Sequence, residues 1–194
     1  MIIMSNVKIR CPWADNDEKM AKYHDEVWGV PAHGDQKLFA KLSLDSMQAG
    51  LAWRTILYKQ ENFMKAFDDF HIETVAAYDE EKVGELMQDA GIVRNQLKIR
   101  AIINNASRIL EVQKEFGSFD AYLWGFTNGG VIRNQWQTLD EIPASSPLSD
   151  AISKDLKKRG FKFVGTTIIY AFLQAVGIVN DHLTSCFRYT ELDQ

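Results

Sequence analysis

Apolar side chains recur at the three- to four-residue spacing of amphipathic helices along nearly the whole chain, whereas the alternation that marks strands is scarce. The longest periodic segment covers residues 95–116. Further helices are expected, in chain order, over residues 18–29, 35–49, 53–70 with a break near Tyr58–Gln60, 71–78, 79–90, 118–126, 148–159 and 166–177. Given the usual length of helices, this pattern predicts an all-α fold of about eight to ten short helices.

Capping residues and glycines mark the ends of these helices. Asp17 precedes the first helix, and Asp35 is expected to cap the second, which Gly50 would end. Residues 127–147 are the least periodic part of the chain and contain an Asn-Gly-Gly turn signal, which predicts a loop. The last eight residues are expected to form a tail.

The composition is that of an ordinary globular protein: 194 residues, of which 46% are hydrophobic and 25% charged. We expect one unit spanning residues 1–194. An arrangement in two helical lobes is compatible with the same pattern, with one lobe formed by residues about 1–35 and 145–194 and the other by about 36–144.

The charge and the hydropathy narrow the range of partners. Because the net charge is −4, any contact with nucleic acid has to come from a local basic face. No apolar run is long enough to cross a bilayer, and residues 1–10 lack the charge order of a secretory signal. We therefore expect a cytoplasmic protein with no membrane partner.

Two cysteine–histidine pairs lie at opposite ends of the chain. His182 and Cys186 are four residues apart, and Cys11 and His24 form the second pair, so both cysteines of the chain are included. Two thiolates and two imidazoles form a closed tetrahedral set that suits structural zinc. The alternative is two buried thiols with unrelated histidines, and on the sequence alone the two interpretations stand level. If zinc binds, it ties the first thirty residues to the last fifteen.

The segment LKKRGFKFVGTT, residues 156–167, resembles the second half of a helix-hairpin-helix DNA-binding element. Its two glycines permit a tight turn, and the backbone N–H groups at the start of the next helix can bind a phosphate. Four basic residues supply local positive charge: Lys157, Lys158, Arg159 and Lys162. The alternative is an ordinary helix–helix turn with a solvated basic face, which is the commoner arrangement.

Aromatic residues lie close to acidic groups in two segments, residues 23–29 and 44–53. A pocket of Tyr23, Trp28 and Trp53 around Asp45 would suit a flat, cationic or electron-poor ring. The carboxylate would accept a hydrogen bond from an exocyclic amine. On the residues alone, core tryptophans beside a solvated Asp45 are the more common arrangement.

Six motifs in order carry a resemblance that covers nearly the whole chain: RCPW (residues 10–13), YHDEVWGVP (23–31), QAGLAW (48–53), DAGIVR (89–94), KKRGFKFVGTT (157–167) and NDH (180–182). In these motifs the chain resembles the 3-methyladenine DNA glycosylase I family, the Tag type, within the helix-hairpin-helix DNA glycosylases. The resemblance implies that fold, together with a structural zinc that ties the N- and C-terminal segments through Cys11, His24, His182 and Cys186.

The same resemblance implies base-excision repair, and we expect a monomer that associates with the nucleoid when it acts on DNA. A 3-methyladenine base would be flipped out of alkylated duplex DNA and excised by hydrolysis of its N-glycosidic bond, leaving an abasic site. The base would lie between Trp53 and Tyr23, with Trp28 nearby and Asp45 as the polar reader.

The resemblance also implies where the duplex is held. The tip formed by Gly50 and Leu51 would occupy the gap left by the flipped base. The hairpin from Gly160 to Gly165, with Lys162 and Thr166, would bind the backbone. Relatives that cleave the strand use a lysine where this chain has Thr166 and Thr167, so we expect a monofunctional enzyme.

The chain departs from the family pattern at two positions in the pocket. Asp45 stands where the family has Glu, which shortens the side chain by about 1.5 Å, and Met20 replaces a tyrosine. A glycosylase of the same fold with an altered lesion preference is therefore one alternative. A non-catalytic, zinc-stapled protein that binds damaged DNA is another. Asp181 is expected to be structural, orienting the zinc site, with a catalytic role as the second possibility.

Overall fold

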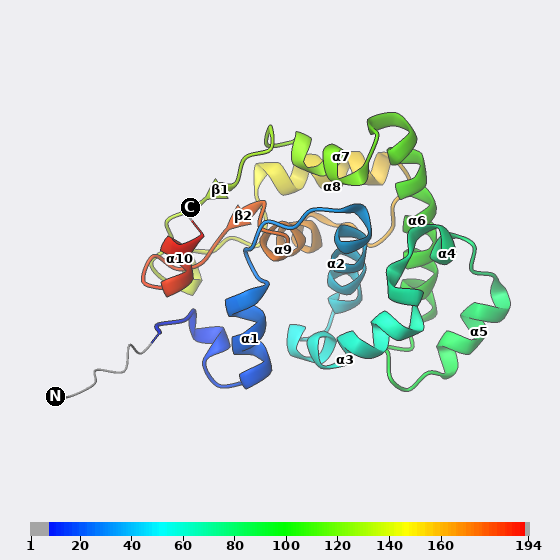
Figure 1. Ribbon diagram of the computed structural model, residues 1–194, viewed down its shortest axis with the longest axis horizontal. Helices are drawn as coiled ribbons and strands as arrows, with labels where there is room; N and C mark the ends of the chain where they lie inside the picture. The colour runs from blue at the N-terminus through cyan, green and yellow to red at the C-terminus, as the bar shows by residue number, and fades with distance from the viewer. Residues whose placement is uncertain (1–7, 193–194) are drawn as a thin grey trace.

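The computed structural model describes residues 8–192, and nearly all of its regular structure is helical (Figure 1). This confirms the all-α expectation. The α-helices are α1 (Glu18–Glu26), α2 (Asp35–Gln48), α3 (Trp53–Ala66), α4 (Ile72–Ala76), α5 (Glu80–Gln88), α6 (Gln96–Phe116), α7 (Phe119–Gly125), α8 (Pro147–Lys158), α9 (Thr166–Ala175) and α10 (Phe187–Glu191). Three 3₁₀ turns accompany them: η1 (Pro12–Ala14), η2 (Asp68–Phe70) and η3 (Leu139–Glu141). None of the helices in this part of the chain is long and apolar enough to cross a bilayer.

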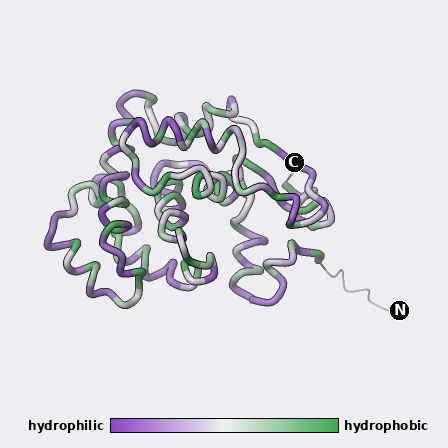
Figure 2. The backbone as a smooth tube through the Cα atoms, turned by 180° about the vertical axis from the view of Figure 1, so that it is seen from behind, coloured by the Kyte–Doolittle hydropathy of each residue, from purple (hydrophilic) through white to green (hydrophobic). Residues whose placement is uncertain are grey.

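Helix α9 lies at the centre of the molecule and packs against α2 and α8 (Figure 1). Its side chains Ile169, Phe172 and Leu173 are fully buried. Apolar and polar positions are mixed along the other helices, as expected for helices that bury one face (Figure 2). Because α2 packs directly on α9, the segments flanking α9 are fixed relative to α2, which carries Asp45.

The first and last described segments of the chain lie side by side. Helix α10 lies near α1 and the N-terminal segment, and the backbone N–H of Phe187 donates to the carbonyl of Ile9 at 2.9 Å (Figure 1). The expected tail is therefore wrong for residues 187–191, which form α10, while residues 193–194 lie outside the described residues. The helix forms because this long-range contact holds a segment that is too short to be helical alone.

A short parallel sheet organises part of the predicted loop at 127–147. Strand β1 (Ile132–Arg133) pairs with β2 (Val179–Asn180), with Ile132 opposite Val179. Further along, the N–H of Thr184 donates to the carbonyl of Trp136 at 2.9 Å. The loop therefore runs beside the segment that carries His182 and supports it.

Two predicted helix boundaries are wrong for identifiable reasons. The N-cap of α2 is Gly34, and the carboxylate of Asp35 instead accepts the N–H groups of Phe119 and Asp120 at 2.9 Å each, at the start of α7. Helix α3 continues unbroken through residues 58–60. It ends where Asp68, Asp69 and Phe70 adopt positive φ angles, which a helix cannot contain.

Candidate active site and metal cluster

The four predicted metal ligands come together in one buried cluster. One donor atom from each of Cys11, His24, His182 and Cys186 lies within 4.8 Å of every other. Cys11 directly precedes η1, His24 is in the last turn of α1, and the other two lie in the turn between β2 and α10. The spacing of four residues between His182 and Cys186 thus spans a tight turn rather than a helical face.

Hydrogen bonds on the outer side of each imidazole orient the cluster. Nδ1 of His24 lies 2.8 Å from the carboxylate of Asp25, which Arg10 holds through an ion pair at 2.8 Å. Nε2 of His182 lies 2.9 Å from the carbonyl oxygen of Trp28. The inner nitrogens, Nε2 of His24 and Nδ1 of His182, therefore face the thiols, as metal-binding histidines do when an outer partner fixes the ring.

The two thiols constrain each other. The contact with Cys186, followed by burial, raises the pKa of Cys11. Contact with Cys11 and with the two imidazoles lowers the pKa of Cys186. A divalent cation that prefers nitrogen and sulfur donors would bind the deprotonated thiols and release their protons. The donor set fits such a cation.

Asp181 does not orient the cluster, contrary to expectation. Its Oδ1 accepts from the side chains of Asn134 at 2.7 Å and Trp136 at 2.8 Å, while its Oδ2 accepts from Tyr170 and Gln174. The side chain is fully buried. Asp181 therefore links the 127–147 loop to α9, and Asp25 is the carboxylate that contacts an imidazole of the cluster, that of His24.

The predicted base-reading residues line one cavity of about 250 Å³. Its walls are Trp13, Met20, Tyr23, Trp28, Asp45, Gln48, Trp53, Ala171 and Gln174. All four predicted residues, one acid and three aromatics, are among them. Trp13 was missed, although it belongs to the RCPW motif at residues 10–13 and its ring meets that of Trp28 edge-on, with 5.2 Å between the ring centroids.

The rings of Tyr23 and Trp53 touch each other. Their centroids are 5.1 Å apart and their planes are inclined by 42°. A flat base stacked between two rings needs a separation of about 7 Å, since each carbon contact takes about 3.5 Å. A base can enter between them only if the two rings part.

Asp45 is a buried acid with an unpartnered oxygen. It is 4% exposed, and its Oδ2 has no hydrogen-bond partner within the described residues. The indole N–H of Trp53, in the same cavity, is the second buried polar atom there without a partner. Burial raises the pKa of Asp45 to about 7, against the opposing charge of Lys41. The cavity therefore contains an unsatisfied acceptor and an unsatisfied donor.

Lys41 belongs to this site, and the sequence analysis missed it. It precedes Asp45 by one helical turn on α2, and its Nζ donates to the carbonyl of Ala175, at the end of α9, at 3.2 Å. Burial lowers the pKa of Lys41 to about 8. The only sequence signal was the spacing of four from Asp45, which places both side chains on one helix face.

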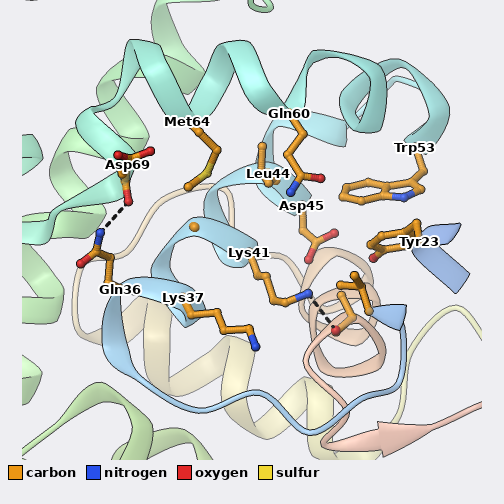
Figure 3. A pocket seen from close by; sticks show the side chains of 13 residues that line it. Tyr23, Gln36, Lys37, Lys41, Leu44, Asp45, Trp53, Gln60, Met64 and Asp69 are labelled. Atoms are coloured by element: carbon orange, nitrogen blue, oxygen red, sulfur yellow. Dashed lines mark hydrogen bonds between the residues drawn. The ribbon is translucent and has the colours of Figure 1, made fainter. Parts of the chain in front are cut away.

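A larger cavity of about 480 Å³ lies on the Lys41 side of Asp45 (Figure 3). It shares Tyr23, Asp45 and Trp53 with the first cavity. Figure 3 shows the Asp45 carboxylate pointing between Lys41 and the Tyr23–Trp53 pair, with Met64 and Gln60 of α3 on the opposite wall. The three shared side chains form the wall between the two cavities.

The predicted hairpin forms as expected. Gly160 has a φ of 87° and Phe163 one of 54°, and α9 begins directly after Gly165. Helix α6 holds the turn, because the side chain of Asn105 bonds both the N–H of Lys162 at 2.8 Å and its carbonyl at 2.9 Å. The hydroxyl of Thr166 is bonded to Ser149 and Asp150 of α8. Among the groups that a phosphate can reach are the first N–H groups of α9 and the exposed Lys162 ammonium.

The turn after α2 lies beside the start of α9. Gly50 has a φ of 78°, Leu51 is 40% exposed, and both line a space of about 190 Å³ with Thr167 and Ile168. The ammonium of Lys98 donates to the carbonyl oxygens of Met47 and Ala49 and holds the end of α2 in place. The predicted tip and the predicted hairpin thus meet on one face.

A helical fold with a glycine hairpin beside a cavity that has aromatic walls and a buried carboxylate defines a helical DNA glycosylase. The methyladenine glycosylase family model matches residues 13–189. The chain belongs to this family.

Relatives match over nearly their full length. DNA-3-methyladenine glycosylase 1 of Escherichia coli K12 is 49% identical over 180 residues, which are 93% of this chain and 96% of that protein. DNA-3-methyladenine glycosylase of Haemophilus influenzae is 40% identical over 177 residues, 91% of this chain and 96% of that protein. A crystal structure of 3-methyladenine DNA glycosylase I (TAG) superimposes with a TM-score of 0.90 at 48% identity, covering 92% of this chain and 98% of the other. A structure that describes 3-methyladenine recognition by 3-methyladenine DNA glycosylase I (TAG) of Staphylococcus aureus superimposes with a TM-score of 0.89 at 36% identity. The match covers 92% of this chain and 95% of the other.

Proposed function

We propose that this protein excises 3-methyladenine from alkylated duplex DNA in base-excision repair, hydrolysing the N-glycosidic bond and leaving an abasic site. Membership of the family supports the reaction. The observation in this chain that carries the proposal is Asp45, a buried carboxylate with an unpartnered oxygen in a cavity with aromatic walls. Such a site suits a flat cation that carries an amine.

Methylation at N3 makes adenine cationic while it is still attached to the sugar. The carboxylate of Asp45 accepts a hydrogen bond from the exocyclic amine, and the rings of Tyr23, Trp28 and Trp53 face the positive charge. Because a cationic base is already a good leaving group, the enzyme needs little general-acid assistance. Its contribution is to hold the extruded base in place while water attacks the sugar carbon.

The hairpin and the turn after α2 would hold the duplex. Leu51 would fill the gap left by the extruded base, and Gly50 would let the backbone approach closely. Gly160 and Gly165 shape the hairpin, whose Lys162 ammonium and following helix N-terminus would bind a phosphate. Thr166 would contribute its backbone N–H, since its hydroxyl is already bonded to α8. One chain carries all of these parts, so we propose that the enzyme acts as a monomer.

Zinc is the metal that we propose for the buried cluster. The donors would be the sulfurs of Cys11 and Cys186, Nε2 of His24 and Nδ1 of His182, which form a closed tetrahedral set. The role is structural, since no donor position is left for a substrate. Tyr23 adjoins His24 in sequence, and the Trp28 carbonyl binds the imidazole of His182. Binding of the metal therefore also fixes two walls of the base cavity.

The start of α9 reads Thr166-Thr167 and offers no amine to form a Schiff base, so we propose a monofunctional glycosylase. A changed lesion preference is the second candidate function, because Asp45 and Met20 both line the cavity and both depart from the family pattern. The same assay separates the two, since a different modified base would be released.

The test is incubation of the protein with methylated duplex DNA and chromatography of the released bases. We expect 3-methyladenine from the wild type and at least tenfold slower release by Asp45→Asn, which keeps the shape and removes the charge. The absence of 3-methyladenine release at enzyme excess would refute the proposal. Tight, salt-dependent binding to abasic DNA without release of any base would instead identify a non-catalytic binder of damaged DNA.

A further inference from the structure

Three cavities follow one another along α2, and Asp45 lines all of them. The space beside Gly50 and Leu51 shares Asp45, Gln48 and Ala171 with the aromatic cavity. The aromatic cavity in turn shares Tyr23, Asp45 and Trp53 with the larger cavity. The order therefore runs from the face proposed to hold DNA, through the base-reading cavity, to the 480 Å³ space near the start of α2.

The order of the cavities fixes which way a bound base points. The glycosidic nitrogen has to face the DNA side, toward Gly50 and Leu51. In adenine the exocyclic amine lies at the opposite end of the ring system from that nitrogen. The amine therefore points inward, toward Asp45, and any group attached to the amine points beyond Asp45.

Entry of the base also opens the wall behind it. Tyr23 and Trp53, now 5.1 Å apart, have to part to about 7 Å to stack on both faces of a base. These two rings separate the aromatic cavity from the larger one. A base inserted between them thus has its amine end at the entrance of the larger cavity.

We propose that the larger cavity is a subsite for a substituent on the exocyclic amine, so that this enzyme accepts 3-alkyladenines that carry one alkyl or arylmethyl group on that nitrogen. This rests on the proposed function of the same site. A singly substituted amine keeps one N–H for Asp45, whereas a doubly substituted amine has none. The substrate class is therefore defined by a remaining N–H and by the direction of the added group.

The larger cavity has the size and the surface for such a group. A closed apolar cavity of about 150 Å³ is enough for a benzene ring, and this one has about 480 Å³. Ala40, Leu44, Met64 and Val27 give it apolar walls, while Lys37 lies exposed at its rim. A benzyl group would pass Lys41 and contact the apolar walls.

The experiment measures binding of three free bases to the intact protein by calorimetry: 3-methyladenine, its N6-benzyl derivative and its N6,N6-dimethyl derivative. We expect the benzyl compound to bind within about threefold of 3-methyladenine. We expect the dimethyl compound to bind at least tenfold more weakly, since a hydrogen bond to a charged group is worth about 1.5–3 kcal/mol. Binding of the benzyl compound that is tenfold or more weaker than binding of 3-methyladenine would overturn the proposal.

Two variants test the location. Ala40→Leu narrows the larger cavity from α2, and Lys37→Trp fills it from the exposed rim without disturbing the core. Each variant should bind the benzyl compound at least tenfold more weakly than the wild type does and should bind 3-methyladenine with unchanged affinity. The unchanged affinity also shows that the variant is folded. Equal binding of the benzyl compound to the wild type and both variants would place the group elsewhere and overturn the subsite. If 3-methyladenine itself does not bind the wild type, the proposed function fails together with it.

Discussion

Lys41 is expected to set the pH below which the enzyme loses activity. The proposed reading of the base requires the ionised carboxylate of Asp45, whose pKa burial raises to about 7 and Lys41 lowers. Activity should therefore fall as the pH drops through about 7. Replacing Lys41 by Met removes the opposing charge and moves this acid limb to higher pH. The other ionisable groups around Asp45 are Tyr23 on α1 and, at the far side of the cavity, Lys37 and Asp69.

The size of the shift follows from the geometry. One helical turn separates the two side chains, so their charges lie on the order of 6 Å apart, and at an effective dielectric constant of about 20 the attraction is about 2.8 kcal/mol, or two pKa units. Lys41 is only partly buried, and screening by solvent reduces this to about one unit. The acid limb should therefore move from about 7 to about 8. At pH 7 the ionised fraction of Asp45 falls from about one half to one tenth, a loss of about fivefold in kcat/KM.

The assay is single-turnover release of 3-methyladenine from methylated duplex DNA, followed from about pH 5.5 to 9.5. Lys41→Met should match the wild type at pH 9, where Asp45 is ionised in both proteins. Lys41→Arg keeps the positive charge and should show the same acid limb as the wild type, at about pH 7. Lys37→Met is the matched control and should leave it in place, because Lys37 is exposed at the rim. Identical acid limbs for the wild type and Lys41→Met would refute the reasoning.

Three further predictions concern the metal, the backbone and the DNA-binding turn. The wild type should contain about one equivalent of zinc by metal analysis, and Cys186→Ser should lose it and unfold at a markedly lower temperature; normal folding of a metal-free wild type would contradict the zinc assignment. Gly177→Ala should lower the free energy of unfolding by about 3 kcal/mol or more in chemical denaturation. The φ of Gly177 is 73°, and the added Cβ would lie 2.4 Å from the backbone of residues 30–31. Gly129→Ala is the control, because Gly129 has a similar φ of 77° but open space around it, so that this variant has only the cost of the backbone conformation. Lys98→Met should weaken binding to abasic duplex in a titration by about tenfold, because it removes the ammonium that binds two carbonyl groups at the end of α2 and holds them in place. Unchanged affinity would show that this lysine does not support DNA binding.

Helices whose signals are local could be predicted from the sequence. Asn95 caps α6 and Ser118 caps α7, each through a side chain that accepts an N–H in the first turn, and the apolar spacing between them is regular. The break predicted in α3 shows the limit of this reasoning. Tyr58 there is half exposed, with its hydroxyl bonded to Asp17 of the α1 cap, and Gln60 lines the larger cavity. Polarity at these positions reflects an exposed face and a cavity wall rather than the end of a helix.

Features made by contacts between distant segments could not be predicted in this way. Helix α10 depends on the bond from Phe187 to Ile9, and β1 forms only because β2 lies beside it. Lys41 is a related case. A lone lysine on a helix is usually solvated, and its place in the cavity follows from the end of α9 lying within reach of its ammonium. The Cys/His cluster was predicted because both cysteines of the chain pair with a histidine and because the family resemblance decided between the two interpretations. The proposed division into two lobes stays a prediction.

The buried position of Asp45 is best understood as a cost that the bound base removes. A carboxylate with an unpartnered oxygen in a cavity with aromatic walls disfavours its own ionised form, which is why its pKa is raised. A neutral purine offers an amine but no positive charge, so it offsets little of this cost. A cationic base offers both, and its binding energy therefore includes the stabilisation of the carboxylate. In the proposed function, the same burial that raises the pKa of Asp45 in the free protein would make Asp45 selective for alkylated over normal adenine, and Lys41 would set how much of that selectivity is available at neutral pH.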